Sequence, residues 1–417
     1  MTQQDRSKER WAQGTIVLAV IMAALLFVVG AGVRFYRSGL RAQPAAPDSF
    51  YVAREPLTAT PGTIIRREIL PDYVAGATVS RVLYQSTGVD GAAVPVSALV
   101  FVPNAPTSVS SRKVVTWAHG AIGVAPRCAP SLIPGVRYAP AIPGLDALIA
   151  AGYVVTATDY QGLGTNGPHP FLIGRAEGAN VLDAVRAARL MPEAHAGADF
   201  LIWGESQGGH AALFAGQLAA TYAPELTLAG VIASAPASDL IELFKAQTAD
   251  PDPVGNILIS MAITSWAKVF HDATLEQVLS PTARPLATSI ANNCIQNADQ
   301  IKASVPAAAI LTKVKFVTTP PWTIEPWKTI VAENTPGGVR TPVPMLITQG
   351  LADVVIAPPV QKAFAARLCT LGDAVDYREY PGIIHIRIAQ DTKAEMVSWI
   401  ADRFAARPAT PNCSSGS

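Results

Sequence analysis

The sequence is poor in charged residues and has almost no net charge. Asp, Glu, Lys and Arg form 15% of its 417 residues, whereas an average soluble protein has about 25%. The 32 basic and 31 acidic residues leave a formal charge of +1, and the basic residues form no stripe. This balance argues against a nucleic-acid partner. Half of the residues are apolar, which predicts a large buried core and argues against disorder.

Cysteine is also scarce, and its spacing excludes the common metal sites. The four cysteines form no Cys-x-x-Cys pair and no Cys/His pattern of the zinc-binding kind. The sequence therefore predicts neither a metal ion nor a cofactor. The N-terminus carries an export signal, described below, and in an exported chain an even number of cysteines predicts disulfides. Four cysteines would form two disulfides with three possible pairings, and buried thiols are the alternative. The residues concerned are Cys128, Cys294, Cys369 and Cys413.

The N-terminus carries a targeting signal. Residues 1–14 include three basic side chains, and residues 15–33 form an uncharged apolar stretch. Its 19 residues fall within the roughly 17–25 that cross a bilayer as a helix and exceed the apolar region of a cleaved signal peptide. We expect a transmembrane signal anchor. A cleaved signal is the alternative, because the small-residue stretch 42–47 follows. Both place the rest of the chain outside the cytoplasm.

The rest of the chain alternates between strand-like and helix-like segments. Residues 34–62 read as a tether, rich in Pro and Ala from residue 40, and residues 63–413 as one domain. The domain begins with β-rich sequence, in which "VDG" at 89–91 predicts a hairpin. Non-alternating apolar runs then predict strands buried on both faces of a mostly parallel sheet. Helical patterns over 176–190, 209–222, 359–371 and 394–405 separate several of these runs, so the predicted fold class is α/β, with flanking helices.

One segment interrupts this alternation. Residues 240–341 are far longer than an ordinary connection between elements, and they include the largely uncharged stretch "NILISMAITSWAKVF". We expect an inserted helical cap or lid. Extra core helices without a gating role are the alternative.

The motif "GESQGG" at 204–209 follows the apolar run "DFLIW" and precedes a helical pattern. A serine hydroxyl needs a base to become a nucleophile, and it must stand clear of the sheet to reach a carbonyl. A sharp strand-to-helix turn provides that exposure, and the glycines relieve its crowding. We therefore predict that Ser206 is a catalytic nucleophile, with an ordinary turn as the alternative.

The order of a catalytic triad on such a turn is Ser, then Asp or Glu, then His. Asp353 follows the predicted strand "PMLITQG", and His385 lies in the loop "YPGIIHI" before the last helical pattern. We predict that His385 takes the Ser206 proton and that Asp353 orients the imidazole. Asp239, after "SAPAS", is the alternative acid.

The oxyanion that forms on attack needs two backbone donors. We expect the N–H of Gln207, next to the nucleophile, and that of Ala121, in the loop "WAHGAIG" that Gly120 helps to shape. Asp159 and Tyr160 begin a loop after a predicted strand, at the sheet end where ligands bind, and we expect them to shape the substrate pocket.

Three separated segments resemble the secretory lipase family of the α/β-hydrolase superfamily. They read "DYQGLGTNGPHPFLIGRAEGANVLDAVRAA", "GESQGGHAALFAGQLAATYAPEL" and "HGAIGVAPRCAPS", and the resemblance covers roughly residues 60–413. It implies an α/β-hydrolase with an inserted helical cap that acts on carboxylic esters of lipids, with the triad at Ser206, Asp353 and His385. It also implies the disulfides Cys128–Cys294 and Cys369–Cys413. The long N-terminal apolar segment departs from the freely secreted members of the family.

The sequence thus predicts a serine lipase or esterase that works through an acyl-enzyme, on a lipid-like ester, with a membrane contact at its N-terminal helix. Two alternatives remain open at this stage. An acyltransferase would use the same triad to pass the acyl group to an acceptor alcohol. A silent hydrolase fold used for binding would leave the triad unused, although all three residues stand in the required order.

Overall fold

The computed structural model describes residues 28–54, 57, 60–106 and 110–413. Among these residues, nine strands form one sheet in the order β1-β2-β3-β5-β4-β6-β7-β8-β9. The first three pair antiparallel, β3 also runs antiparallel to β5, and all pairs from β5 to β9 are parallel. The strands are β1 (Ile64–Leu70), β2 (Ala77–Thr87), β3 (Ala93–Pro103), β4 (Arg112–Ala118), β5 (Val154–Thr158), β6 (Ala196–Glu205), β7 (Thr227–Ser234), β8 (Met345–Gly350) and β9 (Val375–Tyr380).

The predicted hairpin is confirmed, because β2 and β3 pair along their whole length on either side of residues 88–92. In the centre of the sheet, β4, β5 and β8 are almost entirely buried, and so are residues 200–204 of β6 and 230–234 of β7. This burial explains why their sequences lack the polar alternation of a strand with one wet face.

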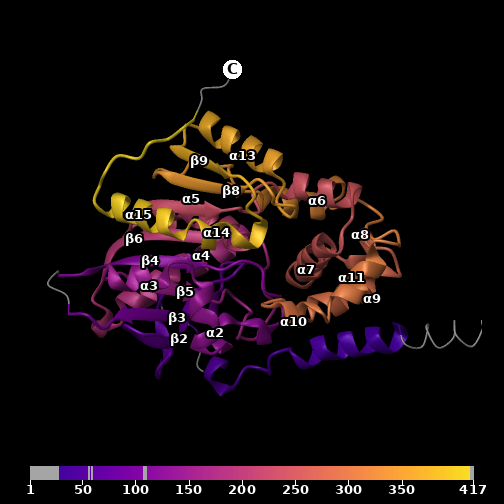
Figure 1. The fold of residues 1–417 in the computed structure, drawn as a ribbon, viewed down its shortest axis with the longest axis horizontal. Helices are drawn as coiled ribbons and strands as arrows, with labels where there is room; N and C mark the ends of the chain where they lie inside the picture. Colours follow the sequence, from indigo (N-terminus) through magenta and orange to yellow (C-terminus); the bar gives the residue numbers. More distant parts are fainter. Residues whose placement is uncertain (1–27, 55–56, 58–59, 107–109, 414–417) are drawn as a thin grey trace, which may run out of the picture.

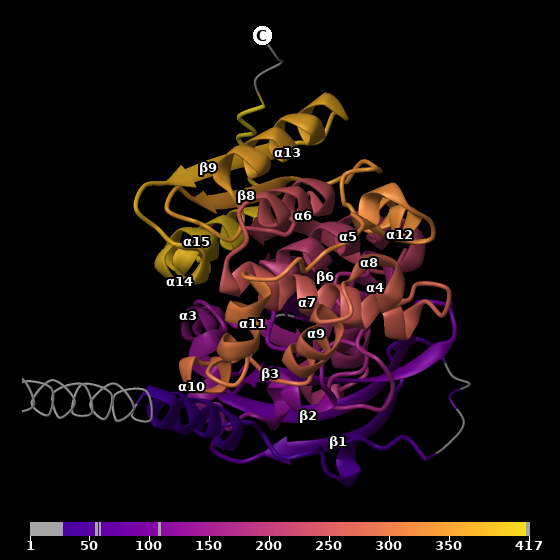
Figure 2. The same ribbon diagram turned by 90° about the vertical axis from the view of Figure 1, so that its right-hand side faces the viewer.

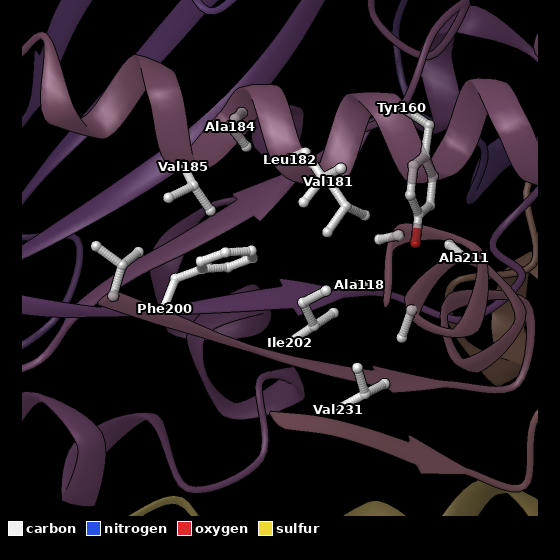
Figure 3. Packing of buried hydrophobic residues seen from close by; sticks show 14 of the residues in the cluster. Ala118, Tyr160, Val181, Leu182, Ala184, Val185, Phe200, Ile202, Ala211 and Val231 are labelled. Carbon is white, nitrogen blue, oxygen red and sulfur yellow. The ribbon is translucent and has the colours of Figure 1, made fainter. Parts of the chain in front are cut away.

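Helices cover both faces of the sheet (Figure 1). On one face, α4 and α5 pack against β4 and β6, and α13 contributes to the same core. On the other face, α3 and α15 contribute to a second core. Figure 3 shows Val181, Leu182 and Val185 of α4 facing Phe200 and Ile202 of β6. The helices are α2 (Gly135–Tyr138), α3 (Leu145–Ala150), α4 (Gly174–Arg189), α5 (Gln207–Tyr222), α13 (Pro358–Thr370), α14 (Ile388–Asp391) and α15 (Lys393–Phe404).

The insertion between β7 and β8 is helical and has a core of its own. This core is built around Trp266 and Trp327, both fully buried. Figure 2 shows these helices gathered in front of the sheet. The expected cap is therefore present. Its helices are α6 (Leu240–Ala249), α7 (Pro253–Val269), α8 (Leu275–Val278), α9 (Ala283–Ala291), α10 (Ala298–Ile301), α11 (Val305–Leu311) and α12 (Trp327–Glu333).

The transmembrane helix expected over residues 15–33 lies mostly outside the described residues, which begin at residue 28. Residues 28–41 are helical and end beside α10 (Figures 1 and 2). Within the described ranges, no helix has both the length and the apolar character to cross a bilayer.

The segment expected to be a tether makes specific contacts with the cap and with the hydrolase body. Gln43 Oε1 accepts a hydrogen bond from the backbone N–H of Cys294 (2.6 Å), and Gln43 Nε2 donates to the carbonyl oxygen of Gln300 (3.2 Å). Further along, the Tyr51 hydroxyl is hydrogen-bonded to Ser131 (2.7 Å). This segment is therefore held to the folded protein at Gln43 and at Tyr51.

Candidate active site

Ser206 occupies the sharp turn between β6 and α5, with φ of 56° and ψ of −117°. The close approach of neighbouring backbone explains the glycines around it. A Cβ atom on Gly208 would lie 1.8 Å from the carbonyl oxygen of Ala118, and one on Gly204 would lie 2.0 Å from that of Gly208. A larger residue at either position would displace main chain that neighbours the nucleophile.

Ser206, His385 and Asp353 form a continuous hydrogen-bonded chain. His385 Nε2 lies 2.9 Å from Ser206 Oγ, and His385 Nδ1 lies 2.8 Å from Asp353 Oδ2. The three residues come from the turn after β6, the loop after β9 and the loop after β8, which meet at the carboxyl end of the parallel strands. With Nδ1–H donated to the carboxylate, Nε2 carries the lone pair that can accept the serine proton.

The Asp353 carboxylate is fixed by the backbone that follows it. Its Oδ1 accepts hydrogen bonds from the N–H groups of Val355 and Ile356, both at 2.8 Å, and its Oδ2 accepts one from Gln349 Nε2 at 3.2 Å. The alternative acid, Asp239, instead caps α6 and forms an ion pair with Arg367 at 3.1 Å. Of the two acids, only Asp353 reaches the histidine.

The expected oxyanion donors lie around the nucleophile. Gln207 is the first residue of α5, so its N–H has no partner within the helix. A Cβ on Gly120 would lie 3.5 Å from Ser206 Cβ, and Ala121 lines the same cavity as Ser206 and Gln207. His119 is buried, and burial lowers its pKa to about 4. It is therefore neutral near pH 7 and holds the loop by a 2.7 Å contact between its Nδ1 and the carbonyl oxygen of Gly120.

Asp159 and Tyr160 do not line the cavity, in contrast to the expectation from the sequence. Both side chains are fully buried. Asp159 accepts hydrogen bonds from Ser97 Oγ (2.6 Å) and from the backbone N–H of Ser131 (3.0 Å), and the Tyr160 hydroxyl donates to the carbonyl oxygen of His119 (3.1 Å). Tyr160 thus contacts the loop that carries Gly120 and Ala121, whereas the Asp159 side chain binds Ser97 and Ser131 in the interior.

A second carboxyl group, that of Glu205, lies beside the triad. The pKa of Glu205 is raised to about 7, and burial is the main cause. His385 partly opposes this rise, and the charge of Asp353 adds to it. Trp203, two residues earlier on β6, belongs to the core formed with α15. Because side chains alternate along a strand, Glu205 lies on that same face of the sheet. No sequence motif identifies this group, since it occupies a variable position of the Gly-x-Ser-x-Gly pattern.

A cavity of about 470 Å³ opens at Ser206 and runs between the cap helices α6 and α7. Its walls are mainly apolar, with a few polar groups. The lining includes Phe171, Leu172, Leu240, Leu243, Phe244, Leu258, Ile259 and Ala262, together with the polar Gln247, Asp250 and Asp252. The sequence indicated an apolar cap, but it could not show which faces of these helices point to the nucleophile.

Both expected disulfides form. Cys128 is bonded to Cys294, and Cys369 to Cys413. The first joins the segment after Gly120 and Ala121 to the cap, and a hydrogen bond from the N–H of Ile295 to the carbonyl oxygen of Ile122 (2.9 Å) lies next to it. Within the described part of the chain, no group of three or more His, Cys, Asp or Glu side chains could hold a metal ion.

Comparisons with known proteins identify the family and the fold. Residues 142–412 match the family described as secretory lipase. Lipase A of Arthroderma benhamiae is 24% identical over 390 residues, which cover 87% of this chain and 80% of that protein. A Mycobacterium tuberculosis protein named "Probable inactive lipase" is 24% identical over 382 residues, which cover 84% of this chain and 80% of that protein. The crystal structure of Candida antarctica lipase A in its closed state superposes with a TM-score of 0.71 at 19% identity, over 88% of this chain and 87% of that one, which shows a shared fold.

Proposed function

Since this chain belongs to the secretory lipase family and is a carboxylic ester hydrolase, we propose that Ser206, His385 and Asp353 are its catalytic triad and that its substrates are lipid-like esters. The observation that carries the assignment of the triad is the pair of contacts on His385, 2.9 Å to Ser206 Oγ and 2.8 Å to Asp353 Oδ2. These distances let one imidazole accept a proton from the hydroxyl while it donates its other N–H to the acid.

The reaction proceeds in two halves. Ser206 Oγ attacks the ester carbonyl as its proton passes to His385 Nε2, and the imidazolium then protonates the leaving alcohol as the C–O bond breaks. An acyl-enzyme remains on Ser206. Water then gives a proton to His385 and attacks the acyl carbon, and the proton returns to Ser206 Oγ as the carboxylic acid leaves. Asp353 keeps the imidazole in one tautomer and stabilises its positive charge.

The negative charge on the carbonyl oxygen is stabilised by the N–H groups of Gln207 and Ala121. Gln207 also benefits from its place at the start of α5, where the helix dipole is positive. A preorganised donor of this kind raises kcat about 10²–10³-fold in a serine hydrolase. The cavity between α6 and α7 is apolar and opens at Ser206, which fits an acyl chain better than it fits a polar alcohol.

The assignment of the nucleophile is tested with the full chain and p-nitrophenyl esters from acetate to palmitate. Ser206→Ala is expected to lower kcat by several orders of magnitude, because the hydroxyl forms the covalent intermediate. Ser238→Ala is a matched control, since it also removes a buried hydroxyl, one that is hydrogen-bonded to Gln361, and it should leave kcat nearly unchanged. Full activity of Ser206→Ala would exclude the proposed triad.

The family and the two disulfides indicate an exported protein. Beyond this, we propose that the apolar segment 15–33 keeps the enzyme attached to the membrane. Its length and the basic residues at both ends support the proposal. Expression of the full chain should leave the activity in the membrane fraction after alkaline carbonate washing. Activity in the culture medium, on a chain whose N-terminus begins after residue 33, would exclude it.

A further inference from the structure

A cluster of buried polar side chains lies behind the nucleophile and takes no direct part in the reaction described above. Glu177 belongs to α4, His169 to the loop before it, and Gln207 and His210 to α5; all four are buried. Glu177 and the two histidines are titratable groups in the protein interior. Such groups are retained only where hydrogen bonds compensate for their desolvation.

The centre of the cluster is the side-chain amide of Gln207. Its Nε2 donates to Glu177 Oε1 at 2.6 Å and to His169 Nε2 at 3.0 Å, so both of its N–H bonds are used. His169 can accept this hydrogen bond because its Nδ1–H is donated to the carbonyl oxygen of Gln161 at 2.8 Å. Burial lowers the pKa of His169 to about 3, so the ring stays neutral and its Nε2 remains an acceptor at any pH at which the enzyme works.

The side chain of Gln207 therefore anchors the residue whose N–H is the proposed oxyanion donor. The direction of that N–H depends on the peptide plane between Ser206 and Gln207, and Ser206 has a backbone conformation that side chains rarely adopt. An anchored side chain limits rotation about the Gln207 backbone. A donor contributes to catalysis only while it points at the position of the developing charge.

Glu177 also reaches the wall of the substrate cavity. Its Oε1 accepts a hydrogen bond from the N–H of Leu172 at 3.0 Å, and Leu172 lines the cavity. The segment before Leu172 is tied to cap helix α7, because Trp266 Nε1 donates to the carbonyl oxygen of Phe171 at 2.7 Å. One carboxylate thus joins the first residue of α5 to the cavity wall.

We propose that Glu177 is a positioning residue of the oxyanion hole, which fixes the direction of the Gln207 N–H by accepting a hydrogen bond from the Gln207 side chain. This inference rests on the proposed triad and oxyanion hole. Glu177 touches neither substrate nor nucleophile. It acts through Gln207, so its loss should affect the transition state more than the binding of the ester.

The test compares Glu177→Leu with Glu177→Gln in the full chain, on a soluble short-chain p-nitrophenyl ester. Glu177→Leu removes the acceptor, and we expect kcat to fall about 10- to 100-fold, less than the loss of a complete oxyanion donor, with KM within about twofold. Glu177→Gln keeps an oxygen for the Gln207 amide and should restore kcat to within about threefold of the native value. A kcat loss with constant KM identifies an interaction made in the transition state.

Asp183 provides a matched control on the same helix. It is also buried, and its Oδ2 accepts hydrogen bonds from Ser86 Oγ at 2.6 Å and Tyr222 Oη at 2.7 Å, away from the nucleophile. Asp183→Leu should lower the melting temperature but leave kcat per folded molecule unchanged. An equal kcat loss in Asp183→Leu would reduce the role of Glu177 to general stability and overturn the proposal.

Two further results would also overturn it: an unchanged kcat in folded Glu177→Leu, or a loss in Glu177→Gln as large as in Glu177→Leu. Should Glu177→Leu not fold, His169→Leu removes the second acceptor of the same amide. It should lower kcat several-fold at constant KM, and an unchanged kcat there contradicts the proposal. Failure of the triad itself is distinguishable, because it would appear as activity in Ser206→Ala.

Discussion

Ser206 has a strained backbone conformation that its hydrogen-bond partners hold in place. Ser206 has a positive φ, which costs about 1–3 kcal/mol for a residue other than glycine. Its backbone is held by hydrogen bonds from its N–H to the carbonyl oxygen of Ser234 (2.9 Å) and from the N–H of His210 to its own carbonyl oxygen (3.0 Å). The exposure of Oγ is thus maintained by the sheet on one side and the helix on the other.

Glu205 should make the stability of the protein depend on pH. Its pKa is raised mainly by burial to about 7, above the roughly 4.3 of an unfolded chain. Between these pH values the folded state binds more protons than the unfolded state. The contribution of Glu205 to the free energy of unfolding is therefore present below about pH 4 and is lost as pH rises to 7. Glu205→Gln has no carboxyl group to ionise, so its stability does not fall for this reason. Its melting temperature relative to the native protein should therefore rise between pH 5 and pH 8.5, by the equivalent of up to about 3 kcal/mol.

Thermal unfolding monitored by circular dichroism at both pH values measures this difference. Glu333→Gln, an exposed change at the end of α12, is the control and should follow the native protein at both. If Glu205→Gln shows the same pH dependence as the native protein, the carboxyl is not held neutral in the fold.

At this scale, sequence patterns identified residues whose position in the chain is tied to their role. Ser206, Asp353 and His385 follow strands in an order that the fold imposes, so their meeting could be anticipated. Asp159 also follows a strand, but it turns inward to Ser97 and Ser131. Whether a side chain at such a position enters a pocket or the core depends on partners that are remote in sequence.

Among the elements, the cap helices determine the shape of the substrate cavity. α6 and α7 contribute about half of its apolar lining residues, and Ser206 and Gln207 line the same cavity. α7 has buried residues on nearly all sides because it lies between α6, α9 and α11. Its sequence therefore shows no amphipathic stripe from which an inner face could have been read. In contrast, α4 and α5 could be placed from the strands that flank them.

A larger side chain on α7 should shorten the range of accepted acyl chains. Leu258 lines the cavity, and Leu258→Trp would occupy space that several methylene groups could fill. Each methylene that no longer fits costs about 1–3 kcal/mol in discrimination, so hydrolysis of long-chain p-nitrophenyl esters should fall about tenfold or more relative to acetate. Measurement of kcat/KM across the series tests this.

Ile310→Trp is the control for Leu258→Trp, since Ile310 lies on cap helix α11, is 48% exposed and is not among the residues that line the cavity. It should leave the chain-length profile unchanged. A profile that is unaltered by Leu258→Trp would mean that the acyl chain does not lie between α6 and α7.

In the molecule as a whole, the two disulfides close loops of very different length. Cys128–Cys294 spans 166 residues and joins the hydrolase body to the cap, whereas Cys369–Cys413 spans 44 residues near the C-terminus. In the chain-entropy model, the longer loop stabilises by about 1 kcal/mol more than the shorter one. The double variant Cys128→Ser/Cys294→Ser should therefore have a lower melting temperature than Cys369→Ser/Cys413→Ser. The reverse order in calorimetry would contradict the loop-length argument.

The overall architecture followed from the alternation of strand-like and helix-like segments, because a parallel sheet with crossover helices has few possible arrangements. The disulfide pairing could not be deduced in this way, since four cysteines allow three connectivities, and only the family resemblance selected one. The contacts of Gln43 with the cap also have no local signal. They depend on the position of Cys294, about 250 residues later in the chain.

The Cys128–Cys294 bond also affects when the protein is completed. Thiols in a reducing cytoplasm stay unpaired, so the covalent link between cap and hydrolase body forms only after the chain has been exported. Before export, only noncovalent contacts join the cap to the hydrolase body, such as the hydrogen bond from the N–H of Ile295 to the carbonyl oxygen of Ile122.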